Sequence, residues 1–215
     1  MDQPRLVDPH TEIRQEVAKL CAKFPGEYWR ALDRERGYPT EFVKALTDAG
    51  FLAALIPEEF GGSGLNMRAA AAIMEEIHAT GCNGAACHAQ MYTMGTILRH
   101  GSAEQKKKYL PGIARGELRL QAFGVTEPTS GTDTLSLRTT AKKDGNSHYL
   151  INGQKIWTSR AEHSDLMLLL ARTTPLDEVK RSRRDALKLI AVSRCSFRSL
   201  RQAPRIACNE SATHS

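Results

Sequence analysis

Long apolar runs are missing from this sequence. Near its middle the longest is the six-residue stretch Leu166–Ala171, whereas a helix needs about 20 apolar residues to cross a bilayer. Compositional bias is missing too, because hydrophobic residues make up 41% and charged residues 25% of the 215 positions, which are ordinary globular values. We therefore expect no membrane partner and no disordered or coiled-coil chain, but one large or two small domains.

The body of the chain also lacks an excess of positive charge, although the formal net charge is +6. Residues 180–215 contain nine basic and two acidic side chains, so this segment alone carries +7 and residues 1–179 carry −1. Proteins that bind nucleic acid place a basic stripe on structured elements. We therefore expect no nucleic-acid partner, and binding through the basic tail is kept only as a minor alternative.

Cysteine is scarce and its number is odd. The five cysteines are irregularly spaced, and the first residues lack the basic-then-apolar pattern of a secretion signal. We therefore expect free thiols and a cytoplasmic location. Cys82, Cys87 and His88 could supply half of a metal site, but tetrahedral zinc needs four ligands and no second pair follows. We expect no metal and interpret these cysteines as small packing residues.

Helical periodicity dominates the first half of the chain. Apolar residues recur every three or four positions, and capping residues such as Asn66 and Ser102 precede two of these runs. Terminators such as Pro25-Gly26 follow others. The pattern predicts helices over about 9–24, 40–49, 66–80, 83–99 and 102–115.

The pattern changes near residue 118 to short β-type runs separated by turn residues such as Asn152-Gly153. We expect an α+β fold with an all-α helical N-terminal domain over 1–117 and a β domain over 118–192. Residues 193–215 have no periodicity, and we interpret them as an unstructured or aberrant tail. The expected strands are 120–125, 135–141, 148–151, 154–158, 165–171 and 185–192.

Three segments carry residues suited to ligand binding. Ile56–Gly64 is rich in glycine, but it follows a helix and lacks the lysine of a phosphate-binding loop, so a helix connector is the simpler interpretation. Phe123–Asp133 is a strand that runs into a loop dense in hydroxyls. In Asn152–Ser159, Trp157 stands beside two hydroxyls, which suits a flat heteroaromatic ring. The alternatives are an ordinary strand connection and a tryptophan in the core.

Together these segments resemble the acyl-CoA dehydrogenase family. The family's flavin loop, roughly V-T-E-P-x-x-G-[ST]-D, is matched by Val125–Asp133, and N-G-x-K-x-W-x-[ST] is matched by Asn152–Ser159. The motif P-E-x-x-G-G-x-G is matched by Pro57–Gly64, and G-[ST]-x-x-Q-[KR]-x-x-[YW]-L-P by Gly101–Pro111. Four motifs in order and at similar separation make the resemblance specific, and it covers about residues 10–192.

The resemblance implies FAD as cofactor and an acyl-CoA thioester as substrate. In such enzymes FAD accepts a hydride from the substrate's β-carbon while a glutamate removes the α-proton. Ser159 matches the usual partner of the flavin N5 edge, but Thr158 is a second hydroxyl there, so which of the two addresses the ring is open. Thr132 is implied to contact both the flavin phosphate region and the acyl-CoA. The implied cofactor-binding residues are Phe123, Val125, Thr126, Thr132, Trp157, Thr158 and Ser159.

Family members are longer than this sequence. They complete the β domain and add a helical bundle that supplies the catalytic glutamate and the oligomer surface. We therefore expect an incomplete antiparallel β-barrel-like domain and a truncated chain, with an out-of-frame tail after about residue 184–193. Neither Glu58, Glu59 nor Glu127 is singled out as a general base, so no catalytic residue is assigned.

The implied partners are an electron-transferring flavoprotein or a similar acceptor, and the family is usually homo-oligomeric. The same scaffold also supports acyl-CoA oxidases and flavin monooxygenases. A non-catalytic remnant that binds flavin or acyl-CoA is the alternative from a different functional class. Loss of the later strands would expose sheet edges and apolar surface in such a remnant.

Overall fold

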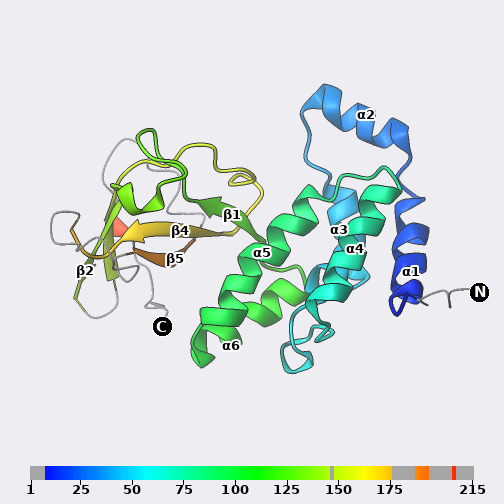
Figure 1. Ribbon diagram of the computed structural model, residues 1–215, viewed down its shortest axis with the longest axis horizontal. Helices are drawn as coiled ribbons and strands as arrows, with labels where there is room; N and C mark the ends of the chain where they lie inside the picture. Colours follow the sequence, from blue (N-terminus) through cyan, green and yellow to red (C-terminus); the bar gives the residue numbers. More distant parts are fainter. Residues whose placement is uncertain (1–7, 146–147, 176–186, 194–204, 207–215) are drawn as a thin grey trace, which may run out of the picture. The chain divides into compact units, whose positions relative to one another are not determined.

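The computed structural model describes residues 8–145, 148–175, 187–193 and 205–206 (Figure 1). These residues divide into two compact units. The first contains the described residues up to Met91 together with Ala114–Gly116, and the second contains Tyr92–Ile113 and the described residues from Glu117 onward. A helical N-terminal part followed by a partial sheet confirms the expected α+β class.

Six α-helices are described, and five of them correspond to the expected segments. Three short 3₁₀ helices, η1 (Phe51–Ala53), η2 (Glu58–Phe60) and η3 (Thr134–Ser136), lie in the connections. Among the described residues, no helix is long and apolar enough to span a membrane. The α-helices are α1 (Thr11–Cys21), α2 (Gly26–Glu35), α3 (Thr40–Asp48), α4 (Met67–Ala79), α5 (Ala85–His100) and α6 (Ala103–Ala114).

The two caps read from the sequence form as expected. The Asn66 side chain accepts a hydrogen bond from the Ala69 N–H at 3.0 Å at the start of α4. Ahead of α6, the Ser102 N–H donates to Gln105 Oε1 at 2.8 Å, and the Gln105 N–H donates to Ser102 Oγ at 3.3 Å. This reciprocal pair satisfies two donors that the first helical turn leaves without partners.

Helix α2 is missing from the sequence expectations, which treat Pro25-Gly26 only as a terminator. Proline also suits the start of a helix, because its missing N–H needs no partner there. Pro25 is the N-cap of α2, and Gly26 opens the helix. No residue of α2 is fully buried.

Aromatic residues link α2 to the core of the first unit. The rings of Phe24, Tyr28, Trp29 and Phe42 meet edge to face with centroids 4.9–5.1 Å apart. The Trp29 indole N–H donates to the Phe24 carbonyl at 3.1 Å, so its one polar atom is satisfied. The core that these rings contact includes Val17, Leu46, Leu52, Ile73 and Ile77.

Three cysteines of the first unit are buried free thiols. Burial raises the pKa of Cys21 to about 11 and that of Cys87 to about 12, so both stay protonated at neutral pH. Cys82 is buried as well. No group of three or more His, Cys, Asp or Glu side chains that could hold a metal ion occurs among the described residues. Cys195 and Cys208 lie outside the described residues.

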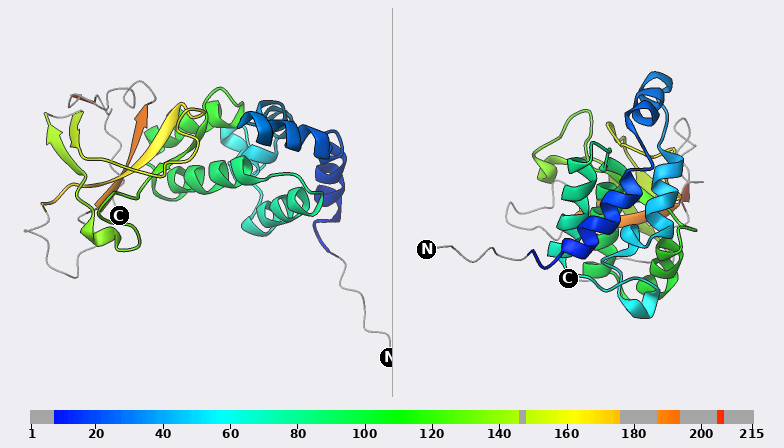
Figure 2. Two further views of the ribbon diagram at one scale, coloured as in Figure 1. Left: turned by 90° about the horizontal axis from the view of Figure 1, so that it is seen from above. Right: turned by 90° about the vertical axis from the view of Figure 1, so that its right-hand side faces the viewer.

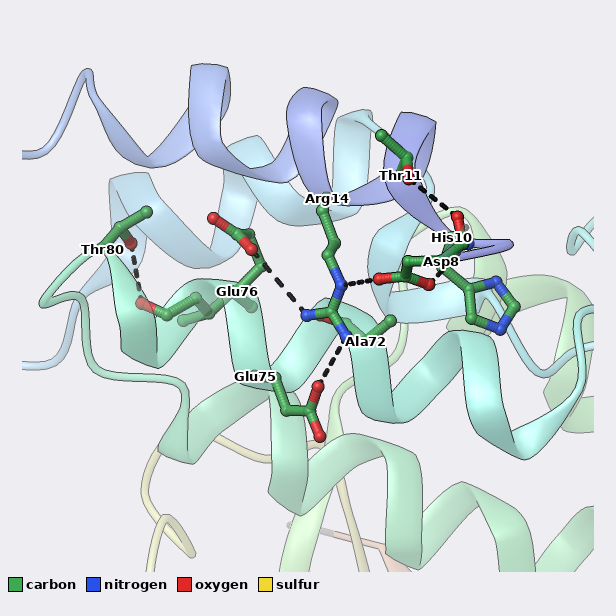
Figure 3. Close-up of polar contacts among 9 residues, drawn as sticks. Asp8, His10, Thr11, Arg14, Ala72, Glu75, Glu76 and Thr80 are labelled. Carbon is green, nitrogen blue, oxygen red and sulfur yellow. Dashed lines mark hydrogen bonds and ion pairs between the residues drawn. The ribbon is translucent and has the colours of Figure 1, made fainter. Parts of the chain in front are cut away.

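Arg14 joins α1 to α4 through a network of acidic side chains (Figure 3). Its guanidinium donates to Asp8 at 2.6 Å and to Glu75 at 2.6 Å, and it lies 3.8 Å from Glu76. The hydrogen bonds to Glu75 and Asp8 raise the pKa of Arg14. The Asp8 carboxylate also accepts the His10 N–H at 2.9 Å. A planar guanidinium presents five N–H donors in a fixed fork, so it can bind several carboxylates at once.

The second unit is built around a six-stranded sheet. The strand order is β1-β4-β2-β3-β6, and β5 pairs with β4. The hairpin β2–β3 turns at Gly145, which has a φ of +69° (Figure 2). The strands are β1 (Leu120–Gly124), β2 (Thr140–Asp144), β3 (His148–Asn152), β4 (Leu166–Arg172), β5 (Leu187–Ser193) and β6 (Arg205–Ile206).

The sheet is mixed, which corrects the expectation of an antiparallel one. Strand β1 pairs with β4 in parallel, and a single parallel pair, Thr140 with Arg172, joins β2 to β4. The other pairings are antiparallel. Parallel neighbours need a long crossover, and here the loops and the β2–β3 hairpin between β1 and β4 provide it. The sheet is not closed into a barrel.

Two expected strands do not form as written. The segment 135–141 begins with η3 and becomes β2 only at Thr140. Ahead of β2, the buried Arg172 donates from its guanidinium to the carbonyls of Leu135 and Leu137. The segment 154–158 contains no strand at all, although the turn residues Asn152-Gly153 before it favour one. The tertiary contacts described below hold it in an irregular conformation.

We predict that Arg14→Met destabilises the protein by about 1 kcal/mol, because three carboxylates lose their shared cation. Urea unfolding at low salt measures the change. Lys19→Met is the matched control, since Lys19 forms only an exposed pair with Glu16 on its own helix, and it should shift the unfolding free energy by less than about 0.5 kcal/mol. Equal effects of the two substitutions would contradict the structural role of the Arg14 network.

Candidate functional site

Two segments far apart in the sequence meet in the second unit. They are the loop that follows β1 and the irregular segment that follows β3. The Ile156 N–H donates to the Thr126 carbonyl at 2.9 Å, and the Lys155 ammonium donates to the Val125 carbonyl at 2.9 Å. The hydroxyl-rich loop and the tryptophan-bearing segment are therefore directly connected through consecutive residues on each side.

A buried ion pair lies at this junction. Lys155 Nζ is 2.8 Å from Glu127 Oε1, and the two side chains are 8% and 3% exposed. The Glu127 carboxylate also accepts the N–H groups of Arg138 at 2.7 Å and of Thr139 at 2.9 Å. Each oxygen thus has a donor, which a buried carboxylate requires.

The electrostatics of the pair follow from burial and from these donors. Burial by itself raises the pKa of Glu127, but the hydrogen bonds from Lys155 and from the Arg138–Thr139 segment outweigh it and bring the pKa down to about 2. Burial lowers the pKa of Lys155, and the contact with Glu127 opposes this shift. A carboxylate that is ionised and fully hydrogen-bonded accepts no further proton at neutral pH, so Glu127 is unsuited to act as a general base.

Glycines allow the segments to approach this closely. A Cβ at Gly153 would lie 2.4 Å from Thr139 Oγ1 and 2.6 Å from Thr139 Cα, so no side chain fits there. Asn152-Gly153 does not form the expected hairpin turn, because no strand occurs over residues 153–165. A Cβ at Gly124 would meet Lys155 Cγ at 3.5 Å. The backbone of β1 thus lies against the stem of the lysine.

Trp157 follows this junction and is not part of a core. Its side chain is 85% exposed, so the alternative of a packed core tryptophan does not apply, whereas Trp29 packs on the core of the first unit. Trp157 has a φ of +59°, as does Arg160. A positive φ is a genuine outlier for a bulky residue and costs about 1–3 kcal/mol unless its surroundings impose it.

The other residues predicted to bind the cofactor lie in or near the same two segments, and their exposure to solvent differs. Phe123 belongs to β1, and its ring centroid is 5.9 Å from that of Tyr92 on α5. Among the described residues, no hydrogen bond of the Thr132 or Ser159 side chain is found. Phe123, Val125, Thr126 and Thr158 are half-buried, whereas Thr132 and Ser159 are exposed. The structure thus connects Thr126 to the Trp157 segment, whereas no hydrogen bond joins Thr132 to that segment among the described residues.

Lys155, Glu127 and Gly153 are absent from the predicted cofactor-binding residues. The two matched motifs specify the residue type at each of these positions. The motifs alone do not indicate what the three residues do. Two surface cavities of the first unit, about 730 and 650 Å³ in volume, are lined by none of the predicted site residues.

Comparison with known proteins gives the family. The model of the acyl-CoA dehydrogenase N-terminal domain matches residues 8–117, and that of the middle domain matches residues 122–203. A glutaryl-CoA dehydrogenase of Desulfococcus multivorans is 36% identical over 168 residues, which are 75% of this chain and 41% of that protein. A mitochondrial isovaleryl-CoA dehydrogenase of Pongo abelii is 33% identical over 173 residues, which are 78% of this chain and 40% of that protein.

Solved structures agree with the sequence matches. The crystal structure of an acyl-CoA dehydrogenase from Geobacillus kaustophilus has a TM-score of 0.77 and 28% identity, covering 90% of this chain and 50% of that one. The chain belongs to the acyl-CoA dehydrogenase family, and it spans about half the length or less of these relatives. The middle-domain match reaches residue 203, so the likeness does not stop at Val192 as the sequence analysis expects.

We predict that Trp157→Asn stabilises the protein by about 1 kcal/mol, because asparagine tolerates a positive φ and the exposed indole contributes little packing. Denaturant unfolding of the flavin-free protein measures the gain. Trp157→Phe keeps the strained backbone and should give no gain. A loss of stability in the asparagine variant alone would mean that Trp157 packs against the fold.

We predict that Glu127→Gln flattens the acid dependence of stability. Because the folded pKa of Glu127 is about 2, below its ordinary 4.5, the carboxylate stabilises the fold above pH 4.5 and loses this effect as the pH falls toward 2. The shift corresponds to roughly 3 kcal/mol. Unfolding free energies at pH 7, 4 and 3 should therefore converge for wild type and variant. Glu162→Gln, at an exposed position, should leave the curve unchanged, and parallel curves for Glu127→Gln would refute the assignment.

Proposed function

We propose that this chain binds FAD at the junction of the loop after β1 and the Trp157 segment, and that it contributes this site to an acyl-CoA dehydrogenase. The observation that carries the proposal is the exposed indole of Trp157 held next to Thr126. An exposed aromatic side chain with hydroxyls beside it suits a flat heteroaromatic ring, which can stack on the indole and accept hydrogen bonds at its edge.

The individual roles that we propose are those that the family motifs imply. Trp157 packs against the isoalloxazine, and Phe123, Val125 and Thr126 line it from the β1 side. Ser159 is exposed, and we assign it the contact with the N5 edge, with Thr158 as the neighbouring hydroxyl. Thr132 is assigned to the flavin phosphate region and to the acyl-CoA.

The proposed reaction is α,β-dehydrogenation of an acyl-CoA thioester. When bound, FAD supplies the acceptor for the hydride that leaves the β-carbon of the substrate. The residues of this chain bind and orient the ring, and an electron-transferring flavoprotein or a similar acceptor is the proposed electron partner. Two relatives are named for glutaryl-CoA and isovaleryl-CoA, so these two thioesters are the first substrates to test.

A second candidate, flavin binding without turnover, is favoured by the state of Glu127. It is the carboxylate at the junction of the two segments, and its hydrogen bonds and low pKa disqualify it as the base that removes an α-proton. The two candidates share the cofactor site and differ in the response of bound flavin to substrate.

We predict that FAD quenches the fluorescence of Trp157. The chain has two tryptophans, so Trp29→Phe leaves Trp157 as the sole indole reporter, and titration with FAD should quench it as the ring stacks. Riboflavin alone should bind about tenfold or more weakly if Thr132 contacts the phosphates, and Thr132→Val should then reduce this preference. No quenching by FAD would overturn the proposed cofactor site.

Anaerobic addition of acyl-CoA to the flavin-loaded protein separates the two candidates. Bleaching of the flavin absorbance by glutaryl-CoA, isovaleryl-CoA or another saturated thioester supports dehydrogenation. Retained flavin that no thioester bleaches supports the non-catalytic alternative. Bleached flavin that oxygen reoxidises rapidly, with formation of peroxide, indicates an oxidase of the same fold.

A further inference from the structure

The contacts of Lys155 and Ile156 together clamp one short stretch of the flavin loop. Lys155 donates to the carbonyl of Val125 and to the side chain of Glu127, and the Ile156 N–H donates to the carbonyl of Thr126 between them. Three consecutive residues of one segment are therefore held by two consecutive residues of the other. Trp157 is the next residue along the chain, so its backbone leaves the clamp directly.

The clamp is in turn anchored to the sheet. Glu127 accepts the N–H groups of Arg138 and Thr139, which immediately precede β2. The Thr139 carbonyl accepts the Arg172 N–H of β4 at 2.8 Å. The carboxylate of Glu127 thus lies between the rigid β2–β4 region and the irregular segment that carries Trp157.

The loop beyond Glu127 also closes on itself. The Glu127 N–H donates to the Ser130 carbonyl at 2.8 Å, and the Ser130 N–H donates back to the Glu127 carbonyl at 3.2 Å. The backbone and the side chain of Glu127 are therefore fixed by separate hydrogen bonds. A substitution that removes the carboxylate breaks the contact with Lys155 and leaves the backbone hydrogen bonds to Ser130 in place.

We infer that Glu127 and Lys155 are positioning residues that hold the Trp157 segment in its binding conformation before any ligand arrives. Preorganisation of this kind raises affinity because the ordering of the segment does not have to accompany binding. Lys155 is a positioning residue rather than a phosphate ligand, since its ammonium is buried and occupied by two protein acceptors. The positioning itself does not depend on the proposed function. Only its purpose, the binding of flavin, rests on the proposed function.

The first test uses the flavin-free protein and the exchange rate of the Ile156 amide. In Lys155→Met, whose side chain has a similar length and no charge, the Ile156 N–H should exchange about tenfold or more faster. The amides of Ala141 and Ile151, paired in the β2–β3 hairpin, should keep their rates and thereby report an intact sheet. Lys142→Met makes the same chemical change at an exposed position of β2 and should leave the Ile156 rate unchanged.

A double-mutant cycle separates loss of the ion pair from simple misfolding. Lys155→Met leaves a buried carboxylate without its cation, and Glu127→Gln/Lys155→Met removes that uncompensated charge. If the two residues act as a unit, the Ile156 amide exchanges no faster in the double variant than in Lys155→Met. Independent, additive effects of the two substitutions, or unchanged Ile156 exchange in Lys155→Met with an intact hairpin, would overturn the inference.

The second test measures FAD binding through Trp157 fluorescence in the Trp29→Phe background. Lys155→Met and the double variant should both bind FAD about tenfold or more weakly than the Lys142→Met control. Equal loss of affinity for FAD and riboflavin supports positioning, whereas loss restricted to FAD makes Lys155 a phosphate ligand and overturns the inference. If the parent protein binds no flavin, the proposed function fails, and the exchange experiment still decides whether Glu127 and Lys155 position Trp157.

Discussion

The ion pair between Glu127 and Lys155 holds together the parts of the second unit that carry the candidate site. Two charges in a protein interior lose their hydration, and only close pairing together with further hydrogen bonds offsets that loss. Here the carboxylate has the Arg138 and Thr139 amides and the ammonium has the Val125 carbonyl. The pair therefore forms only when the β1 loop, the start of β2 and the segment after β3 are all in place, and it ties the three to one arrangement.

Trp157 illustrates what that arrangement achieves. An exposed indole on a backbone with positive φ is unfavourable for the isolated segment, since it buries no surface and strains the chain. Such strain persists where neighbouring contacts over-determine the conformation, and it concentrates at binding sites. The hydrogen bond from Ile156 to Thr126 fixes the residue before the indole. The free energy that would be gained by relaxing Trp157 is thus outweighed by contacts that relaxation would break.

Local signals in the sequence were sufficient for most of the helices, but not for the sheet as a whole. Asn66 and Ser102 act through neighbours three residues away, so their caps are readable from the sequence. The parallel pairing of β1 with β4 joins residues more than 40 positions apart, and no local pattern encodes it. The segment 154–158 follows a turn sequence and is expected as a strand, but no strand forms there, and the Lys155 side chain donates to Val125 and Glu127. The family motifs identified Thr126 and Trp157 as candidate neighbours, whereas the pairing that brings them together required the fold.

The same geometry divides two tasks that carboxylates can perform in an acyl-CoA dehydrogenase. A base must have a pKa near the working pH and an open oxygen facing the substrate. Glu127 has neither, because its pKa is about 2 and protein donors occupy its oxygens. The low pKa and the occupied oxygens of Glu127 suit a residue that holds segments together, and they make it unsuited to proton transfer. A carboxylate for that step has to stand outside this junction, where burial without compensating donors can raise its pKa. In the proposed dehydrogenase, orientation of the ring and removal of the proton would therefore fall to different residues.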